Sequence, residues 1–560
     1  MLKFTHWFVT LSFLLTLGAS AQAQSAGGMR DVAGYGAKPD GKTLNTKAIN
    51  QAISACSTAG GGTVIFPAGQ YLSGSIELRQ NVTLHLEAGA VIVGSTNLED
   101  YALETAPGSA APSRAGLLTA RNAGNIAITG RGIIEGNGMF FVDPARLKLS
   151  EGSDYDKKYT RQGEDFMNPK YGTADGPLEP KDRPNNLLRF FNCTNILLSG
   201  VTIQNSPIWT VHFAQCERVN VTGVAINSFG GGRRVPNDDG IDLAGTRYVH
   251  ISDCDIQNGD DGIVVLGGEK ITVANCTLSS RSAAVRVGFA GADIRDCVFA
   301  NLVIFDSNRG LAVNVRGASS IENVLFSDIV IQTRLVTGHW WGKGEPIQVS
   351  ALPWDPRINQ IGRIKNVRFR NITADSPAGI IVYGCEQSVI KDLLFQGVKV
   401  RINNSPLHQS YGGNFDLRGC RDVATAVFAH DIPAFYCRYA DGVKIDGLEV
   451  EWADGLPSFF SHGIQCENFN NVDIDGFSGG PAHKDGGKAA IALSKGAKVS
   501  IRNSRAARGT GVFVSVADVV DGGLFVNNDL REARVVCQPE KLPFQASGNL
   551  LPKEAGDKRP

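Results

Sequence analysis

The chain of 560 residues lacks an excess of charge of either sign, because Lys plus Arg and Asp plus Glu both total 55. Proteins that bind nucleic acid or anionic membranes through their charge carry a basic surplus. Beyond its first residues, the sequence also lacks any apolar run near the ~18 residues of a membrane span. We therefore expect neither a nucleic-acid partner nor a membrane-embedded mature protein.

The N-terminal residues have the pattern of a secretory signal peptide. Lys3 and His6 precede the apolar run 7–17, which is followed by the small-residue segment Gly18-Ala-Ser-Ala-Gln-Ala23. A short positive region, an apolar stretch too short to span a bilayer and an Ala-Gln-Ala ending are typical of a cleaved signal. We expect residues 1–23 to be removed and the mature protein to be secreted or periplasmic.

The eleven cysteines do not have the spacing of a disulfide framework. Five of them recur mostly every 21 to 23 residues, which indicates a repeated interior position rather than paired half-cystines. Buried free thiols pack as small apolar groups. We therefore predict free, buried thiols at these positions, which are Cys193, Cys216, Cys254, Cys276 and Cys297.

A short pattern of alternating apolar residues, interrupted by a central Asn, Asp or Gly, recurs along the chain. Alternation with period two predicts strands, and the central residue predicts a turn between them. Repeats that cannot bury their own apolar face are stable only when stacked. The pattern predicts an all-β protein, a parallel β-solenoid with one core. Its copies are 81–92, 125–136, 195–206, 218–229, 248–259, 270–281, 322–333, 365–376, 441–452 and 471–482.

Other segments depart from the repeat. Residues 45–57 have apolar positions at helical spacing and precede three glycines, which predicts a short capping helix over the first coil. Segments 138–184, 334–362 and 401–440 are long polar interruptions, which we interpret as loops beside a binding face. We expect the solenoid to span residues 24–545 and a C-terminal tail to follow at 546–560.

The string Asp-Asp-Gly-Ile occurs at 238–241 and again at 260–263, 22 residues later. One coil of offset should place Asp238 over Asp260 and Asp239 over Asp261, ~4.8 Å apart. Clustered carboxylates repel one another, so at least one should hold its proton near neutral pH. A protonated and an ionised carboxyl side by side can perform glycosidic cleavage. Turn formation or calcium binding are the alternatives that this string leaves open.

These residues resemble known motifs. Asn237-Asp-Asp-Gly240 and Gly259-Asp-Asp261 resemble, at the same spacing, two motifs of the polygalacturonase-like enzymes of glycoside hydrolase family 28. The resemblance implies a right-handed parallel β-helix that hydrolyses α-linked uronic-acid polysaccharides such as pectin, with inversion and without metal or other cofactor. It implies that Asp260 is the general acid and that Asp239 and Asp261 activate the attacking water. The resemblance covers roughly residues 30–330, including 35–41, 60–67, 132–138 and 205–209.

Two family motifs are absent. Ser280-Arg-Ser282 stands in place of Gly-His-Gly, and Asn314-Val-Arg316 stands in place of the uronate-binding Arg-Ile-Lys. Replacement cations could come from several arginines, each of which could equally be a surface residue. A His-Trp-Trp sequence in the 334–362 interruption could form a platform for sugar rings or the small core of its own loop. The residues that we expect to bind substrate are Asn237, Asp238, Asp242, Arg281, Arg286, Arg316, His339 and Trp341.

The sequence therefore predicts an inverting glycoside hydrolase for a pectic or related acidic polysaccharide, or its oligosaccharides. Insertions that close one end of the cleft would favour attack from chain ends. A calcium-dependent polysaccharide lyase on the same scaffold, or a non-catalytic carbohydrate-binding solenoid, are the alternatives. The first would need a basic residue for proton abstraction, and the second would need no catalytic group.

Overall fold

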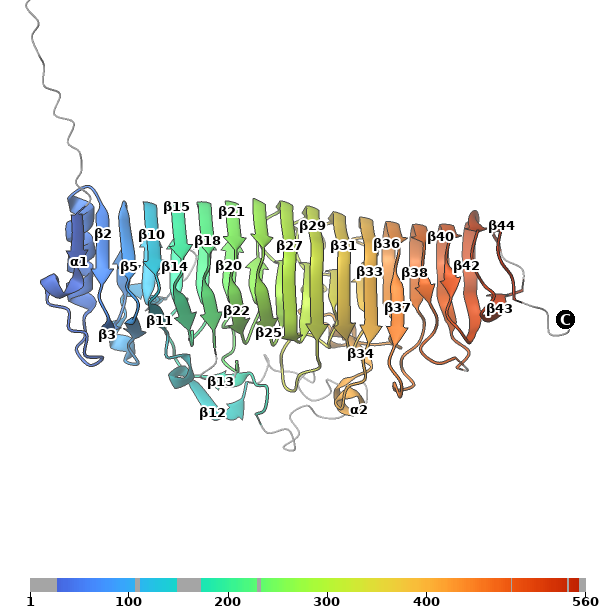
Figure 1. Cartoon of the computed structure of the whole chain (residues 1–560), viewed down its shortest axis with the longest axis horizontal. Coiled ribbons are helices and arrows are strands. Elements are labelled where there is room, and N and C mark those ends of the chain that lie inside the picture. The colour runs from blue at the N-terminus through green and yellow to red at the C-terminus, as the bar shows by residue number, and fades with distance from the viewer. Residues whose placement is uncertain are drawn as a thin grey trace, which may run out of the picture.

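The computed structural model describes residues 28–105, 111–148, 173–228, 233–484, 486–540 and 543–552. The predicted signal peptide, residues 1–23, lies outside these described residues. The described chain forms a long row of stacked coils, with α1 (Thr46–Thr58) covering one end (Figure 1). This helix buries Ile49, Ala52, Ile53 and Cys56, so the capping helix expected from the sequence is confirmed.

One sheet of 38 strands unites the coils in the described part of the chain. Its strands pair in parallel between neighbouring coils, and the predicted repeats coincide with them. The longest column of paired strands consists of β2 (Gly62–Phe66), β5 (Val82–Leu86), β10 (Gly124–Gly130), β15 (Thr194–Ser199), β18 (Glu217–Thr222), β21 (Thr246–Ser252), β24 (Gly268–Ala274), β27 (Ile294–Ser307), β29 (Ile321–Thr333), β31 (Ile364–Ser376), β33 (Ile390–Ile402), β36 (Phe435–Asp446), β38 (Ile464–Asp475), β40 (Ala489–Arg502) and β42 (Thr510–Val526).

Two further columns flank the corner that carries the acidic repeats. The column that enters this corner contains β3 (Gly69–Ser73), β6 (Ala90–Gly94), β11 (Ile133–Glu135), β16 (Thr202–Gln204), β19 (Ala225–Asn227), β22 (Asp255–Asn258) and β25 (Thr277–Ser280). The column that leaves it contains β9 (Leu118–Arg121), β14 (Leu188–Phe191), β17 (Val211–Ala214), β20 (Ile241–Ala244), β23 (Ile263–Val265), β26 (Ala283–Phe289), β28 (Arg309–Val315), β30 (Ile347–Ala351) and β32 (Ile380–Tyr383).

Asn, Asp or Gly residues at the centre of the repeats make the turn that the sequence predicts. Asp253 and Asn275 have φ values of 57° and Asn301 has 55°, in the left-handed region that these residue types tolerate. Their side chains also bond from coil to coil: Asn275 donates to Asp253 Oδ1 and Asn301 donates to Asn275 Oδ1, both at 3.3 Å. The turn residue therefore sets the coil's bend and its register.

The core runs through the inside of all coils. Phe299, Phe326, Phe369 and Phe395 stack in successive coils with ring centroids 4.8–5.1 Å apart. All eleven cysteines lie in described segments with free thiols, and all but Cys385 are buried. The cysteine prediction agrees with this arrangement.

Three irregular regions, formed by the described parts of 138–184, 334–362 and 401–440, protrude on one long side of the row (Figure 1). The first contains the hairpin β12 (Val142–Leu147) and β13 (Leu178–Pro180), and the third contains α2 (His408–Tyr411), β34 (Asn414–Asp416), α3 (Val423–Ala426) and β35 (Val427–Ala429). At the C-terminal end, β44 (Gln545–Ser547) pairs with β42 and Leu550 bridges to Asp529, so the solenoid continues into the segment expected to be a tail. Among the described helices, none has the length and apolar composition to cross a membrane.

Candidate active site

The two copies of Asp-Asp-Gly-Ile lie in adjacent coils, as their 22-residue offset predicts. Ile241 pairs with Ile263 in the register of β20 and β23. The corner before these strands is held by backbone hydrogen bonds, in which Gly240 N donates to Asp261 O at 2.9 Å. Asp239 and Asp261 therefore project from equivalent places on neighbouring coils.

Asp238 has a structural position in this corner. Its Oδ1 accepts hydrogen bonds from Gly259 N and Asp260 N, both at 2.8 Å, and the side chain is buried. A Cβ atom on Gly259 would lie 2.5 Å from this oxygen, so the close approach requires glycine. Burial, its largest influence, raises the pKa of Asp238 to about 7. Expected as a substrate-binding residue, Asp238 instead lies behind the site and supports the backbone that presents Asp260.

A cavity of about 700 Å³ lies over the corner, and all three irregular regions contribute to its wall. Its acidic floor comes from Asp239, Asp242, Asp260 and Asp261, with Asn237 beside them. The location of the loops beside this cavity agrees with their prediction from the sequence. The loop residues in the wall are Lys148, Pro177, His339, Trp340, Trp341, Trp354, Gly419, Cys420 and Arg421.

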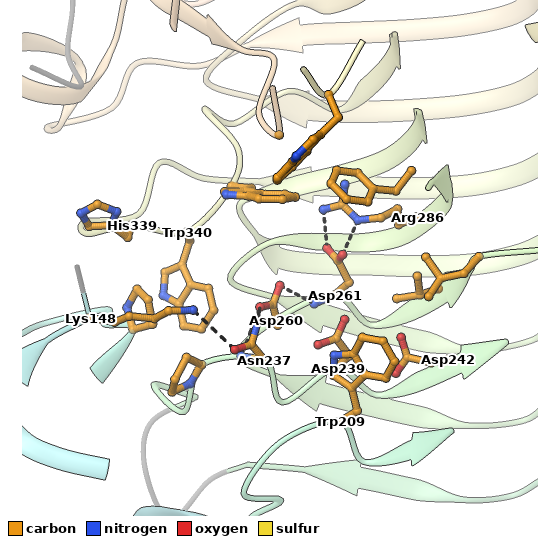
Figure 2. Close-up of a pocket in the computed structure, with 18 of the residues that line it drawn as sticks. Lys148, Trp209, Asn237, Asp239, Asp242, Asp260, Asp261, Arg286, His339 and Trp340 are labelled. Atoms are coloured by element: carbon orange, nitrogen blue, oxygen red, sulfur yellow. Dashed lines mark hydrogen bonds and ion pairs between the residues drawn. The ribbon is translucent and has the colours of Figure 1, made fainter. Parts of the chain in front are cut away.

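The carboxyls of Asp239, Asp260 and Asp261 point into the same space (Figure 2). One oxygen from each lies within 4.8 Å of the others. Burial, followed by the charge of Asp242, raises the pKa of Asp239 well above its ordinary value. Burial and the neighbouring Asp261 raise the pKa of Asp260 to about 6, although Lys148 and Arg286 act against this shift. The cluster therefore holds protons at a pH at which an isolated aspartate has lost its own.

Arg286 forms a two-point ion pair with Asp261. Its Nη2 donates to Asp261 Oδ1 at 2.8 Å and its Nε donates to Oδ2. The third nitrogen, Nη1, donates to Asn314 Oδ1 at 3.1 Å. Both members of the pair are buried, so Arg286 balances the charge of Asp261 from the pocket wall.

Asn237 positions Asp260 from the preceding coil. Its backbone, with φ of 60°, directs the N–H toward Asp260 Oδ2 at 3.2 Å. Its side-chain Oδ1 accepts from Arg183 Nη2 at 3.2 Å and from Lys148 Nζ at 3.4 Å. The predicted Asn237 thus lies at the site, next to two cations that sequence reasoning missed.

Aromatic side chains pack around Arg286 in the pocket wall. The ring centroids of Phe289 and Trp341 are 5.4 Å apart, as are those of Phe289 and Trp354, and the Arg286 guanidinium lies 5.4 Å from the Trp341 ring. His339 also lines the pocket, and burial lowers its pKa to about 3, so its imidazole is neutral. The predicted His339 and Trp341 are therefore part of the cavity, and both belong to an irregular region.

Two arginines predicted to bind substrate lie outside the pocket lining. Arg281 pairs with Asp306 at 3.2 Å and with Asp175 at 3.5 Å. Arg316 is fully buried and donates to Gly419 O at 2.8 Å and to Leu417 O at 3.1 Å. The structure thus corrects their expected role, because both attach irregular regions to the coils.

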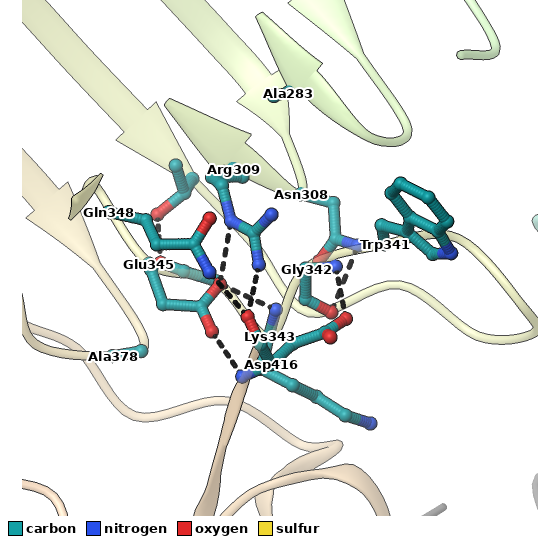
Figure 3. Close-up of polar contacts among 12 residues, drawn as sticks. Ala283, Asn308, Arg309, Trp341, Gly342, Lys343, Glu345, Gln348, Ala378 and Asp416 are labelled. Carbon is teal, nitrogen blue, oxygen red and sulfur yellow. Dashed lines mark hydrogen bonds and ion pairs between the residues drawn. The ribbon is translucent and has the colours of Figure 1, made fainter. Parts of the chain in front are cut away.

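A second buried polar group, which we call the clamp, joins two irregular regions and consists of Arg309, Glu345, Asp416 and Arg418. Figure 3 shows Arg309, Glu345 and Asp416 together. Arg309 Nε lies 3.3 Å from Glu345 Oε2, and Arg418 Nη2 lies 2.7 Å from Asp416 Oδ2. Asp416 Oδ2 accepts from Gly342 N at 2.6 Å, and Arg418 Nη2 donates to Trp340 O at 2.6 Å. The clamp therefore fixes both residues that flank Trp341 in the chain.

The carboxyls of Asp239, Asp260 and Asp261, whose nearest oxygens lie within 4.8 Å of one another, could also supply ligands to a divalent cation. Arg286, however, donates to both oxygens of Asp261 and already places a positive charge against the cluster. A cation bound by all three carboxyls would have to displace this guanidinium. The donor set thus fits an acid–base site better than a metal site.

The chain was compared with known proteins. The family model described as "Glycosyl hydrolases family 28" matches residues 56–411. An exo-poly-alpha-D-galacturonosidase of Dickeya chrysanthemi is 27% identical over 383 residues, covering 61% of this chain and 62% of that protein. A probable polygalacturonase of Vitis vinifera is 24% identical over 369 residues, covering 61% of this chain and 68% of that protein. The matched region thus spans 62% of the first relative and 68% of the second.

Among solved structures, a hyperthermoactive exopolygalacturonase from Thermotoga maritima superposes with a TM-score of 0.57 at 22% identity. The match covers 76% of this chain and 91% of that one. At this identity the likeness shows the fold, which is the right-handed parallel β-helix that the sequence resemblance implies.

Proposed function

The chain belongs to glycosyl hydrolases family 28, and from this premise we propose that it is an inverting hydrolase of α-glycosidic bonds in a pectic or related acidic polysaccharide. The observation that carries the proposal is the cluster of Asp239, Asp260 and Asp261 on the floor of one cavity. Buried carboxyls with raised pKa values are the groups that acid–base cleavage of a sugar linkage needs.

In this proposal Asp260 protonates the leaving oxygen. Asn237 N–H orients one of its oxygens, and its pKa of about 6 lets it carry a proton under mildly acidic conditions. Asp239 accepts a proton from the attacking water, while Arg286 holds Asp261 beside it. The proton that Asp239 takes from water then returns to Asp260, so the acid is restored after each turnover.

The nearest oxygens of Asp239, Asp260 and Asp261 lie within 4.8 Å of one another, whereas inverting glycosidases usually hold their two carboxyl groups ~6.5–9.5 Å apart. Inversion therefore rests on the family resemblance alone and is the first property to measure. The test is digestion of pectic and algal polysaccharides, with the anomeric configuration of the new reducing end followed by NMR. A product that first appears with the opposite configuration supports the proposal, and retained configuration refutes the inverting step.

We also propose attack from chain ends, because three irregular regions surround one cavity instead of leaving an open groove. An enzyme of this kind releases small products while the polymer stays long. Product size and viscosity, followed in the same digestion, test this point. An early collapse of viscosity before small sugars accumulate would show internal cleavage.

Export remains part of the proposal and is supported by the signal-like pattern of residues 1–23. Expression of the full chain in a bacterial host, followed by N-terminal sequencing of the exported protein, tests it. A protein that starts at Gln24 outside the cytoplasm is expected. Retention of residues 1–23 on a cytoplasmic product would refute it.

Two rival functions have distinct outcomes. A calcium-dependent lyase would produce an unsaturated sugar with ultraviolet absorbance, and EDTA would abolish its activity. A non-catalytic binding protein would retain glycans without releasing reducing ends. Hydrolysis that persists in EDTA and yields no ultraviolet-absorbing product excludes both.

A further inference from the structure

Among the described residues that line the pocket, three side chains carry a formal positive charge, and two of these have acidic partners. Arg286 is bonded to Asp261 through two nitrogens. Arg421 lies 3.2 Å from Asp355 Oδ2. Lys148 forms no ion pair within the described part of the chain; its Nζ has one hydrogen bond, at 3.4 Å, to the neutral Asn237 Oδ1. Of these described lining cations, Lys148 is therefore the one whose charge is available to a ligand.

The hairpin of the first irregular region fixes the place of Lys148. Strand β12 ends at Leu147 and pairs with β13, and Lys148 N donates to Pro177 O at 2.7 Å. Figure 2 shows the side chain extending from this hairpin toward Asn237, with His339 and Trp340 nearby. A half-buried lysine on a hydrogen-bonded backbone loses less side-chain freedom on binding than one on a free loop.

Lys148 also lies close to the proposed acid. Asn237 contacts both groups, since its N–H donates to Asp260 and its Oδ1 accepts from Lys148. Burial raises the pKa of Asp260 and lowers that of His339; the positive charge of Lys148 opposes the first shift and adds to the second. A sugar residue whose linkage oxygen meets Asp260 would therefore bring its substituents within reach of the lysine.

We propose that Lys148 binds the carboxylate of a uronate residue adjacent to the cleaved bond, and so sets the preference for acidic over esterified sugar. This inference rests on the proposed function. It assigns this task to an irregular region, because Arg281 and Arg316, the two coil arginines expected to bind substrate, are engaged outside the pocket. Trp340, also in the pocket wall, offers an apolar surface beside the proposed pair of Lys148 and the uronate carboxylate.

Binding measurements on a hydrolysis-deficient protein test the proposal without requiring turnover. Two proteins would be compared: both carry Asp260→Asn, and one also carries Lys148→Met. For each, we would measure by calorimetry the Kd of an oligogalacturonide and of its fully methyl-esterified form. We expect the substitution to weaken binding of the free acid about 10-fold, the size typical of a lost charge-assisted hydrogen bond. Binding of the ester should change less than about twofold by the same reasoning.

Two further variants serve as controls. Lys148→Arg keeps the charge and should retain most of the preference for the acid. Lys181→Met removes a charge from the same irregular region at an exposed position outside the pocket, and should leave both Kd values unchanged. Equal thermal midpoints with and without the Lys148→Met substitution would show that the fold is intact.

The outcomes separate the inference from the function on which it rests. If Lys148→Met weakens both ligands equally, or neither, the inference is wrong while the proposed function stands. If the protein that retains Lys148 binds neither ligand and the wild type hydrolyses no pectic substrate, the proposed function fails and the inference fails with it.

Discussion

Buried carboxyl groups occur in two neighbouring parts of this molecule, and their surroundings differ. In the clamp, Glu345 and Asp416 are buried and each is paired with an arginine. On the pocket floor, Asp239 and Asp242 are equally buried. There, Asp239 Oδ1 and both oxygens of Asp242 have no hydrogen-bond partner in the part of the chain that the structure describes.

This difference separates groups that hold the fold together from groups held ready for chemistry. A buried carboxyl without a partner costs free energy of folding, and removing one partner of a buried ion pair is strongly destabilising because it leaves an unpaired buried charge. Burial also raises the pKa of Asp239 and of Asp242 well above the ordinary value, with neighbouring carboxyls adding to the shift. Perturbed groups in a cavity are typical of active sites. Substitutions in the two regions should therefore have opposite effects on stability.

The largest effect is expected from Asp260→Asn on the pocket floor. Losing a general acid lowers the rate by roughly 10²- to 10⁴-fold. The free energy of unfolding should stay equal or rise, because the substitution removes a charge from a crowded acidic cluster. Initial rates on the preferred pectic substrate, together with urea unfolding, measure both quantities. An unchanged rate would remove Asp260 from the mechanism.

The next effect is expected from Asp416→Ala in the clamp. It leaves Arg418 buried without its carboxylate and should lower the free energy of unfolding by about 3–5 kcal/mol. It also releases Gly342 N, so Trp341 should be held less firmly and KM should rise. The exposed Asp454 gives a matched control, since Asp454→Ala should change stability by less than about 0.5 kcal/mol. Urea unfolding of both variants measures the difference, and equal effects at both positions would contradict the structural role of the clamp.

The solenoid and the acidic cluster could be predicted from the sequence because both depend on periodicity. A 22-residue offset is enough to stack Asp239 near Asp261, since the coil itself fixes their relation. Asn237 and Asp242 lie beside these motifs along the chain and so appear in the same cavity. Every such residue belongs to a coil whose neighbours can be read from the repeat.

Residues in irregular regions gave no comparable signal. Lys148 lies in a hairpin far along the chain from Asn237, which it contacts. Arg316 was expected at the substrate, but its partners Leu417 and Gly419 come from a region about one hundred residues later. An arginine's role depends on which carboxylates and carbonyls approach it, and only the folded chain settles that. Thus the coils were predictable and the contacts between insertions were not.

A smaller effect is expected from pH on the stability of the wild type. Asp238 and Asp260 have folded-state pKa values raised to about 7 and about 6, above the ~3.9 of an unfolded aspartate. Between pH ~3.9 and these raised pKa values, the folded state therefore binds more protons than the unfolded state. The stability of the folded state is greatest at the acidic end of this pH range. Their contribution is lost as pH rises through about 6 and 7, with a slope of up to about 1.4 kcal/mol per pH unit for each group.

Thermal unfolding between pH 5 and pH 8 measures this dependence. We expect the midpoint to fall across the range, and Asp260→Asn to make the fall shallower by removing one of the groups whose pKa is raised in the folded state. A midpoint that rises steadily from pH 5 to pH 8 would show that paired carboxyls dominate the titration and that the pocket floor is ionised in the folded protein.

The smallest and most discriminating effect is expected from Asp242→Asn. Asp242 lies in β20 between the register partners His212 and Val264, and neither of its oxygens is paired within the described residues. An amide of the same shape carries no charge, so the free energy of unfolding at pH 8 should rise by about 1 kcal/mol. Hydrolysis should nevertheless decline, because the charge of Asp242 helps to raise the pKa of Asp239. Urea unfolding and pH–rate profiles measure the two effects. If Asp242→Asn destabilised the protein as Asp416→Ala is expected to do, Asp242 would be a structural residue like those of the clamp, and the contrast between the two regions would disappear.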